Sequence, residues 1–376
     1  MRYVDEFRNG ELAERLALRI ADEAQAGHTY RLMEFCGGHT HAISRYGLLD
    51  LLPPGVNMIH GPGCPVCILP AGRLEQAIDL ALQHHVTLCS YGDCLRVPAR
   101  AGRSLLKAKA QGAAVHMMYS ASDALELARN EPERQVVFLA IGFETTAPTT
   151  AAVIKQAAAL RVSNFSVLCN HVLTPAAMHA LLTIQNEPQG GARLHGFVGP
   201  AHVSLVIGSR AYQAFPRDYA TPVVIAGFEP LDVMQAVLML VRQINNGRAE
   251  VENEFSRAVT SDGNRKAQAL MDEIFELRSE FEWRGLGNIK NSALKIRPRY
   301  AKFDAEVRFA LEYRSVPEHR GCECAAILRG EKRPQACRIF GTACTPETPL
   351  GACMVSAEGA CAAHYTYRRF RQESGQ

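Results

Sequence analysis

Short apolar runs alternate with helical segments along the first two thirds of the chain, and this alternation constrains the fold more than any other feature. One amphipathic helix is expected over residues 11–26. Strands are then expected at 30–35, 56–60, 86–90, 114–119, 136–141, 165–170, 194–198 and 222–226. Helical stretches lie near 40–50, 71–84, 102–111, 121–130, 148–160, 174–185, 201–214 and 230–247. The pattern predicts an α/β protein with parallel sheets covered by helices, and functional loops at the carboxyl ends of the strands.

A weak internal echo indicates how the eight strands divide. The tetrad Ile-Gly-Phe-Glu at 141–144 is matched by Ala-Gly-Phe-Glu at 226–229, and each copy ends an apolar run and opens a helix. Chance likeness of two strand–Gly–helix turns, or one eight-stranded sheet, would also fit. The echo favours two similar units of four strands, with Glu144 and Glu229 pointing into a shared cleft. We therefore expect α/β domains at 1–134 and 135–250.

The remaining residues, 251–376, are expected to form a third, C-terminal domain. Residues 250–282 are highly charged and predict a solvated helical region. After Pro298 the chain has few periodic segments, many glycines and prolines, and six cysteines. Such a segment can bury little apolar surface, so it should be irregular or helical and depend on a metal centre for part of its stability.

Composition excludes several classes of protein. The 376 residues are 47% hydrophobic and 21% charged, as in ordinary globular proteins, and the net charge of +3 with no long basic run gives no sign of nucleic-acid binding. No apolar run is long enough to span a membrane, and the charged N-terminus lacks the apolar core of a signal peptide. We expect a cytoplasmic protein that is monomeric in isolation. In a reducing compartment, its twelve cysteines favour metal or redox chemistry over structural disulfides.

Two cysteines lie in the loop Gly-Pro-Gly-Cys-Pro-Val-Cys at 61–67, directly after an expected strand. Proline fixes φ and glycine admits unusual backbone angles, so the loop should hold Cys64 and Cys67 in a defined geometry. At this spacing two thiols can share a metal ion, close a redox disulfide, or simply belong to a tight turn.

Another thiol loop, Phe-Cys-Gly-Gly-His-Thr-His at 35–41, joins an expected strand to a helix. The glycines should leave Cys36 uncovered, and a helix N-terminus should lower the pKa of its thiol. His39 or His41 could add a ligand or carry a proton, although a capping role is the ordinary one for such a histidine. If the loops at 36 and 61–67 end neighbouring strands, Cys36, Cys64 and Cys67 converge as soft ligands for iron(II), zinc or copper(I).

The C-terminal cysteines form a separate group. Cys324-x12-Cys337-x6-Cys344-x16-Cys361 supplies the four thiolates that a [4Fe–4S] cluster needs, and a four-thiolate zinc site is the alternative. Cys322 and Cys353 are additional, so spacing alone leaves the choice of four open.

Taken together, these motifs resemble the HypD family of [NiFe]-hydrogenase maturation factors. The resemblance rests on the stretches 35–41 and 60–67, on Gly-Phe-Glu-Thr-Thr-Ala-Pro at 142–148, and on the C-terminal cysteine spacing, and it runs essentially end to end. It implies two α/β domains and a third with a [4Fe–4S] cluster on Cys324, Cys337, Cys344 and Cys361. It also implies that Cys36 holds an iron together with a cysteine of the small chaperone HypC. HypE would deliver cyanide for the Fe(CN)2CO group, and Cys64 and Cys67 would lie beside the iron.

The resemblance implies an assembly scaffold with thiol and iron–sulfur redox activity rather than a conventional turnover enzyme. No G-x-G-x-x-G follows an expected strand, so electrons would pass from the cluster to a Cys64–Cys67 disulfide rather than from a nucleotide cofactor. His39 and Glu144 are expected to line the same cleft. The alternatives are a cysteine-nucleophile transferase with a structural zinc, and a protein whose loops serve docking alone.

Overall fold

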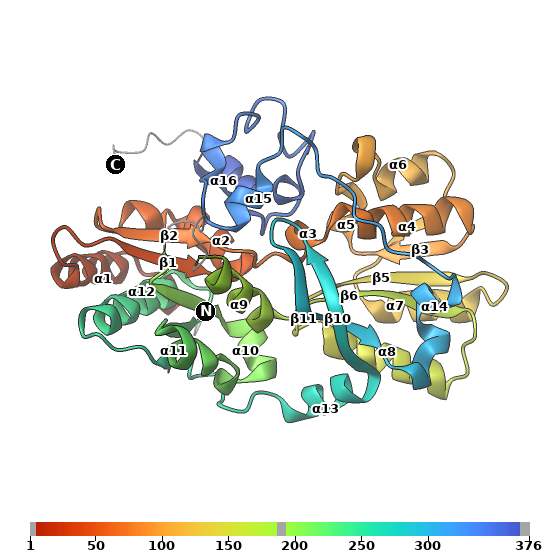
Figure 1. Ribbon diagram of the computed structural model, residues 1–376, viewed down its shortest axis with the longest axis horizontal. Helices are drawn as coiled ribbons and strands as arrows, with labels where there is room; N and C mark the ends of the chain where they lie inside the picture. Colours follow the sequence, from red (N-terminus) through yellow and green to blue (C-terminus); the bar gives the residue numbers. More distant parts are fainter. Residues whose placement is uncertain (1–4, 186–192, 369–376) are drawn as a thin grey trace.

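Two parallel β-sheets, an antiparallel hairpin and a cysteine-rich C-terminal segment make up the structure (Figure 1). The structure is a computed structural model, and it describes residues 5–185 and 193–368. In Figure 1 one sheet lies on the left and the other on the right, with the hairpin between them and the cysteine-rich part of the C-terminal segment above. The expected fold class is confirmed.

The left-hand sheet has five parallel strands in the order β2-β1-β7-β8-β9. Its strands are β1 (Tyr30–Glu34), β2 (Val56–His60), β7 (Gly196–Pro200), β8 (Val223–Ala226) and β9 (Val251–Asn253). Its helices are α1 (Gly10–Glu23), α2 (Gly37–Tyr46), α10 (Ala201–Ile207), α11 (Ala214–Tyr219) and α12 (Pro230–Asn245). The long helix α12 packs against α1 and β8. Apolar side chains from the first stretch of this unit, which begins with α1, and from the second, which includes α12, therefore share one core.

The right-hand sheet has four parallel strands in the order β4-β3-β5-β6. Its strands are β3 (Thr87–Ser90), β4 (Val115–Met117), β5 (Val136–Gly142) and β6 (Phe165–His171). Its helices are α4 (Ala71–Gln83), α5 (Gly92–Arg96), α6 (Leu105–Ala110), α7 (Ala121–Asn130) and α8 (Ala147–Ala159). Helix α9 (Thr174–Gln185) follows β6 but lies on the left in Figure 1, where its His179 packs against α11. Every residue of β5 and β6 is buried, as expected of central parallel strands covered on both faces.

The strands do not group as the sequence analysis expected. The chain builds β1 and β2, crosses to build the whole four-stranded sheet, and then returns to complete the five-stranded sheet with β7, β8 and β9. The four-stranded sheet does consist of consecutive strands, but these are the third to sixth of the chain, and the other sheet has five strands drawn from both ends, so the sheets do not divide at residue 135. An apolar run specifies a buried strand but not its neighbour, so the echo between 141–144 and 226–229 could not reveal this pairing.

The charged stretch 250–282 is only partly helical, which corrects the sequence prediction. It contains β9, helix α13 (Arg265–Ile274) and strand β10 (Phe275–Trp283), which pairs antiparallel with β11 (Gly287–Ile296). Along β10, Phe275, Phe281 and Trp283 are buried while most of the residues between them are not. The hairpin lies against β6, where Val172 bridges to Ala293, so it closes one side of the four-stranded sheet.

The C-terminal segment is irregular, as expected, with short helices. They are α14 (Ala305–Arg308), α15 (Cys324–Leu328) and α16 (Ala360–Arg368). Helix α16 packs against α2, and the turn Ala352–Met354 packs against α3 (Pro65–Ile68). The cysteine-rich segment therefore rests on the two loops that carry Cys36 and the pair Cys64 and Cys67.

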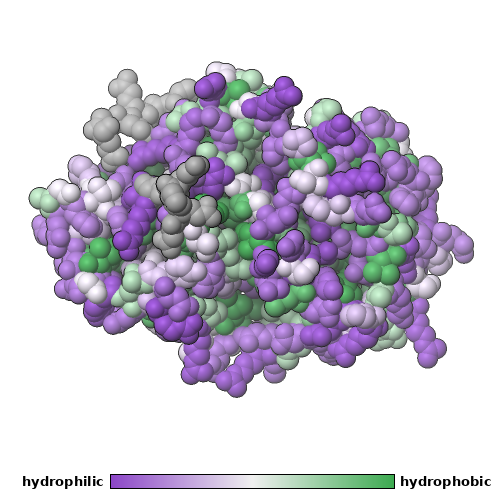
Figure 2. Space-filling model, in the orientation of Figure 1, coloured by the Kyte–Doolittle hydropathy of each residue, from purple (hydrophilic) through white to green (hydrophobic). Residues whose placement is uncertain are grey.

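The surface in Figure 2 is largely hydrophilic, with hydrophobic residues showing near the middle of the face and in smaller patches elsewhere. Among the helices in the described parts of the chain, none has the length and apolar character needed to cross a membrane.

Candidate thiol and metal site

Cys36 lies at the topological switch point of the five-stranded sheet, where strands are added on opposite sides of β1. Strand β1 is flanked by β2 on one side and β7 on the other, so the carboxyl ends of β1 and β7 form the crevice where parallel sheets usually bind ligands. Cys36 follows β1 and is the N-cap of α2, and its Sγ accepts a hydrogen bond from the Gly38 N–H at 3.3 Å. The strand-to-helix turn thus fixes the direction of the sulfur.

A buried carboxylate holds this turn in place. Glu34 has no exposed surface and accepts hydrogen bonds from the Cys36 N–H at 2.8 Å and from the Thr40 hydroxyl. His60 Nδ1 lies 2.8 Å from the same carboxylate. These three partners satisfy a group that would be costly to bury alone, and they tie the ends of β1 and β2 to α2.

The direct neighbour of the Cys36 sulfur is His202, which the sequence analysis did not single out. Its Nδ1 lies 3.2 Å from Cys36 Sγ, and it sits in the first turn of α10, just after β7. Burial lowers the pKa of His202 to about 4, so the ring is neutral and can accept a hydrogen bond from the thiol. The sequence could have identified His202, because it follows the expected strand 194–198 and functional residues gather at the carboxyl ends of parallel strands.

Cys36 is neither uncovered nor acidified by its helix, which corrects two expectations. Its exposed fraction is 2%, and burial raises the pKa of its thiol well above the usual value. The charges of Glu358 and Glu34 raise it further, whereas hydrogen bonds from the first N–H groups of α2 lower it. Desolvation in this crevice outweighs the favourable field at the helix N-terminus.

His39 and His41 have hydrogen-bond partners other than the thiol. His39 is fully buried, and its Nε2 donates to the backbone carbonyls of Ala226 at 3.1 Å and Gly227 at 2.9 Å. His41 Nε2 lies 3.0 Å from the Tyr367 hydroxyl. His39 thus ties α2 to the end of β8, and its ring stacks near Phe228, which in turn contacts His202.

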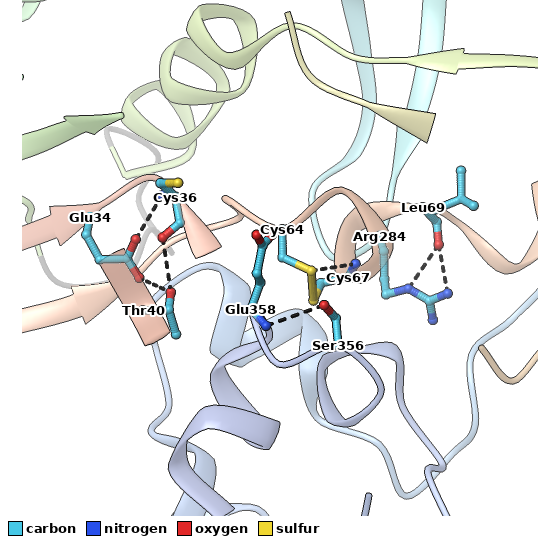
Figure 3. Close-up of a disulfide and its surroundings, with 9 residues drawn as sticks. All are labelled: Glu34, Cys36, Thr40, Cys64, Cys67, Leu69, Arg284, Ser356 and Glu358. Carbon is cyan, nitrogen blue, oxygen red and sulfur yellow. Dashed lines mark hydrogen bonds between the residues drawn. A yellow bond between two sulfur atoms is a disulfide. The ribbon is translucent and has the colours of Figure 1, made fainter. Parts of the chain in front are cut away.

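Cys64 and Cys67 form a disulfide on the loop next to Cys36 (Figure 3). The backbones of the two loops are in contact: Gly37 N–H donates to the Gly63 carbonyl at 3.0 Å, and a Cβ at Gly63 would collide with the Cys36 backbone. Cys64 is the N-cap of α3. The structure therefore brings the three cysteines to neighbouring loops, but the Cys36 sulfur turns toward His202 and the other two are bonded to each other.

The C-terminal segment contributes Glu358 to this region. A Cβ at Gly37 would collide with the Glu358 side chain, and Figure 3 shows Glu358 beside the disulfide. Burial of its carboxyl raises the pKa of Glu358, and the charges of Asp93 and Glu34 add to that effect. The residue as a whole is nevertheless exposed to solvent.

Glu144 is buried just after β5, at the topological switch point between β3 and β5 of the four-stranded sheet. Its two carboxyl oxygens accept from the N–H and the hydroxyl of Thr174, each at 2.9 Å. Its echo partner Glu229 instead forms an ion pair with Arg8 near the surface. The two glutamates therefore have different partners.

Replacing Glu144 with glutamine should weaken the dependence of stability on pH. Burial raises the pKa of Glu144 from 4.5 to about 7, so the folded protein binds a proton that the unfolded chain has lost. Its contribution to stability therefore falls as pH rises from about 4.5 to 7, by on the order of 3 kcal/mol. Urea unfolding at pH 5 and pH 8 should show a smaller difference for Glu144→Gln, and an unchanged difference would contradict this assignment.

Five of the six C-terminal cysteines line one small pocket, here called the thiol pocket. They are Cys322, Cys324, Cys337, Cys344 and Cys361. Apolar side chains complete its wall, namely Ile327, Ile339, Phe340 and Met354. Cys353 is fully buried behind it, within hydrogen-bond reach of Cys324 and Cys361.

The pocket leaves the choice between Cys322 and Cys324 open, because a Cβ at Gly351 would meet the sulfurs of both. Within the described residues, no three His, Cys, Asp or Glu side chains are already arranged around a single metal ion.

The tip of the β10–β11 hairpin connects the thiol pocket to the disulfide loop. The buried guanidinium of Arg284 donates to the Leu69 carbonyl at 2.7 and 3.1 Å and pairs with Glu318. On the other side, Gly285 lies so close to Ala325 of α15 that a Cβ there would clash, and Arg329 donates to the Gly285 carbonyl at 2.7 Å.

Comparison with known proteins identifies relatives along nearly the whole chain. A family model described as "HypD: Hydrogenase formation hypA family" matches residues 11–368. The chain is 65% identical over 372 residues to the hydrogenase maturation factor HypD of Azotobacter vinelandii, and 62% identical over 372 residues to that of Cupriavidus necator. Each of these matches covers 99% of this chain and 98% of the relative. It is 44% identical over 379 residues to HypD of Escherichia coli, with both chains covered completely.

The fold and site define a class of α/β protein with a buried thiol at a sheet crevice, a neighbouring disulfide and a cysteine-lined pocket. Within that class, the chain belongs to the HypD family of hydrogenase maturation factors. Its role in hydrogenase maturation follows from this membership.

Proposed function

We propose that the chain is the scaffold on which the Fe(CN)2CO group is assembled, and that Cys36 is the thiolate that holds the iron cargo. The observation that carries this proposal is the position of Cys36 Sγ at the β1–β7 crevice, with neutral His202 at 3.2 Å. A fixed, buried sulfur beside a neutral imidazole is a soft donor set suited to iron(II). The network around Glu34 orients the sulfur in the way that outer partners orient metal ligands.

A single thiolate leaves most coordination positions of the iron free for other donors. Those positions suit a cysteine of a HypC-type small chaperone and the diatomic ligands, with cyanide supplied through HypE. Glu358 and the Cys64–Cys67 pair lie at the edge of the same crevice, where a second protein would bring its own ligand. The burial of Cys36 implies that this approach opens the crevice before the iron enters.

We further propose that the thiol pocket holds a [4Fe–4S] cluster, with Cys324, Cys337, Cys344 and Cys361 as ligands. The donor set fits: five thiols face one apolar-walled pocket, and Cys344 Sγ accepts a hydrogen bond from the Leu350 N–H at 3.4 Å. When bound, a cluster would supply one-electron chemistry. The turn Ala352–Met354 packs on α3, which carries Cys67, and Met354 also lines the thiol pocket; this contact supports a thiol relay between the pocket and the disulfide.

The buried thiol argues against the alternative of a cysteine-nucleophile transferase. Such an enzyme needs an accessible thiolate at neutral pH, whereas burial raises the pKa of Cys36 and leaves 2% of the residue exposed.

Metal analysis of anaerobically isolated protein tests the proposal. Expected are about four irons and four sulfides per chain, with broad absorbance near 400 nm, and a further iron when the small partner is present. One tightly held zinc in colourless protein would overturn the cluster assignment and restore the transferase alternative.

Single serine substitutions should identify the cluster ligands. Cys337→Ser, Cys344→Ser and Cys361→Ser should each lose iron and sulfide and loosen the C-terminal segment, because cluster binding contributes to its folding. Of Cys322 and Cys324, one should be needed and the other should not; we assign the ligand to Cys324. Cys353→Ala is the matched control, since its sulfur does not line the pocket. Iron loss in Cys322→Ser with retention in Cys324→Ser would move the fourth ligand to Cys322.

A further inference from the structure

A groove of about 880 Å³ lies between α5, α6 and the C-terminal segment, and its rim is basic. Five exposed cationic or titratable side chains face it, and we call it the basic groove: Arg96, Arg100, Lys107, His319 and Arg320. Within the described residues, neither the Arg100 nor the Arg320 guanidinium pairs with a carboxylate, although the Arg100 backbone N–H donates to Glu75 at 2.8 Å. Two acidic residues also line the groove, Glu318 and Glu347, and the first is paired with buried Arg284.

The basic groove adjoins both redox elements of the proposed function. Leu350 lines the groove, and its N–H donates to Cys344 Sγ in the thiol pocket. Glu318 lines it too, and its partner Arg284 binds the Leu69 carbonyl two residues after Cys67. A partner seated here would be separated from the thiol pocket by little more than the 350–351 backbone.

The groove has the character of a protein-docking surface. Its basic side chains are exposed at the rim, and Leu106, half of whose surface is accessible, adds an apolar contact. A small-anion site would instead hold its ligand with buried, convergent donors. Exposed charges of one sign around an apolar patch steer an oppositely charged partner and fix its orientation.

We propose that the basic groove docks a small acidic protein that carries one electron at a time. This inference rests on the proposed redox role of the Cys64–Cys67 pair. Reducing that disulfide breaks one S–S bond and forms two thiols, which takes two electrons and two protons. The electrons come from two successive reduced carriers, each oxidised once, and the protons come from solvent.

Binding of an acidic plant-type [2Fe–2S] ferredoxin, used as the probe, tests the docking surface directly. Calorimetry at low ionic strength, with both proteins oxidised, should show a complex that salt weakens. The double variant Arg100→Glu/Arg320→Glu should bind at least about tenfold more weakly. Arg100→Lys/Arg320→Lys should bind nearly as well as the parent. The matched control is Arg19→Glu/Arg129→Glu, which makes the same charge change at exposed positions on α1 and α7.

Disulfide reduction separates this inference from the function on which it rests. Mass labelling of new thiols should show that the groove variant is reduced more slowly by ferredoxin but at the parental rate by methyl viologen. Unchanged ferredoxin binding in the groove variant, or equal weakening in the control, would overturn the docking surface. So would displacement of ferredoxin by a polyuridylate oligonucleotide that binds more tightly. Failure of viologen to reduce the parental disulfide would instead refute the redox role. The calorimetric binding measurement would still decide whether ferredoxin docks in the groove.

Discussion

Replacing Cys36 with serine should abolish hydrogenase maturation while leaving the fold intact. Serine is close to isosteric, is a favoured N-cap, and can keep the hydrogen bonds to Gly38 and His202. It removes the soft sulfur, however. Losing an outer partner of a metal ligand typically costs about 10–100-fold in affinity, so losing the ligand itself should cost more. Hydrogenase activity in a strain that lacks the native factor, and cargo iron bound with the small partner, should both fall to background.

The melting temperature of Cys36→Ser decides whether this loss is chemical. It should stay within a few degrees of the parent, whereas Cys36→Ala should lose about 1 kcal/mol because the cap is gone. Maturation by Cys36→Ser at a substantial fraction of the parental level would remove the thiolate from the proposal. His202→Gln provides a graded comparison, because it keeps a polar group near Cys36 Sγ but removes the imidazole; it should weaken iron capture without abolishing it.

Strand positions were predictable from the sequence because each buried parallel strand is an apolar run between turn residues. All eight expected strands are present, and β2 has the expected bounds 56–60. Strand order was not predictable, since partners such as β1 and β7 lie about 165 positions apart and match only in being apolar. Strand β10 was missed because charged residues occupy its solvent-facing positions. They obscured the alternating pattern in which Phe281 and Trp283 are buried.

The site was predictable where a reactive side chain and the glycines or prolines that shape its loop stand in one short motif. Cys36, Cys64 and Cys67 stand in glycine- and proline-rich loops, and the structure places these loops together. Glu34 and Glu358 carry no such local signal: one sits inside an apolar strand, and the other comes from a turn more than 300 residues away. Thiol acidity also escaped prediction, because the helix N-terminus is visible in the sequence whereas the desolvation that outweighs it depends on the tertiary fold.

Replacing Cys64 or Cys67 with serine should abolish maturation and also lower stability moderately. Both residues stand in a short loop, but the structure buries them, with 3% and 0% exposed, in the main core. In Cys67→Ser a buried hydroxyl without a partner costs about 1–3 kcal/mol, whereas the entropy of closing so short a ring adds little. In Cys64→Ser the hydroxyl can still accept from the Cys67 N–H as the N-cap of α3, so the cost should be smaller. The melting temperature should therefore fall by several degrees in Cys67→Ser and by less in Cys64→Ser. Activity should be lost far beyond what that destabilisation explains, because neither variant can cycle between dithiol and disulfide.

Cys89→Ser separates the two effects. Cys89 is fully buried in β3 and has no place in the crevice or the thiol pocket. Its serine variant should lose a similar amount of stability yet support maturation at nearly the parental level. If Cys89→Ser lost activity as completely as Cys67→Ser, the loss would reflect packing. If Cys64→Ser and Cys67→Ser supported maturation, the crevice would work without a redox pair and the electron route proposed here would have no acceptor.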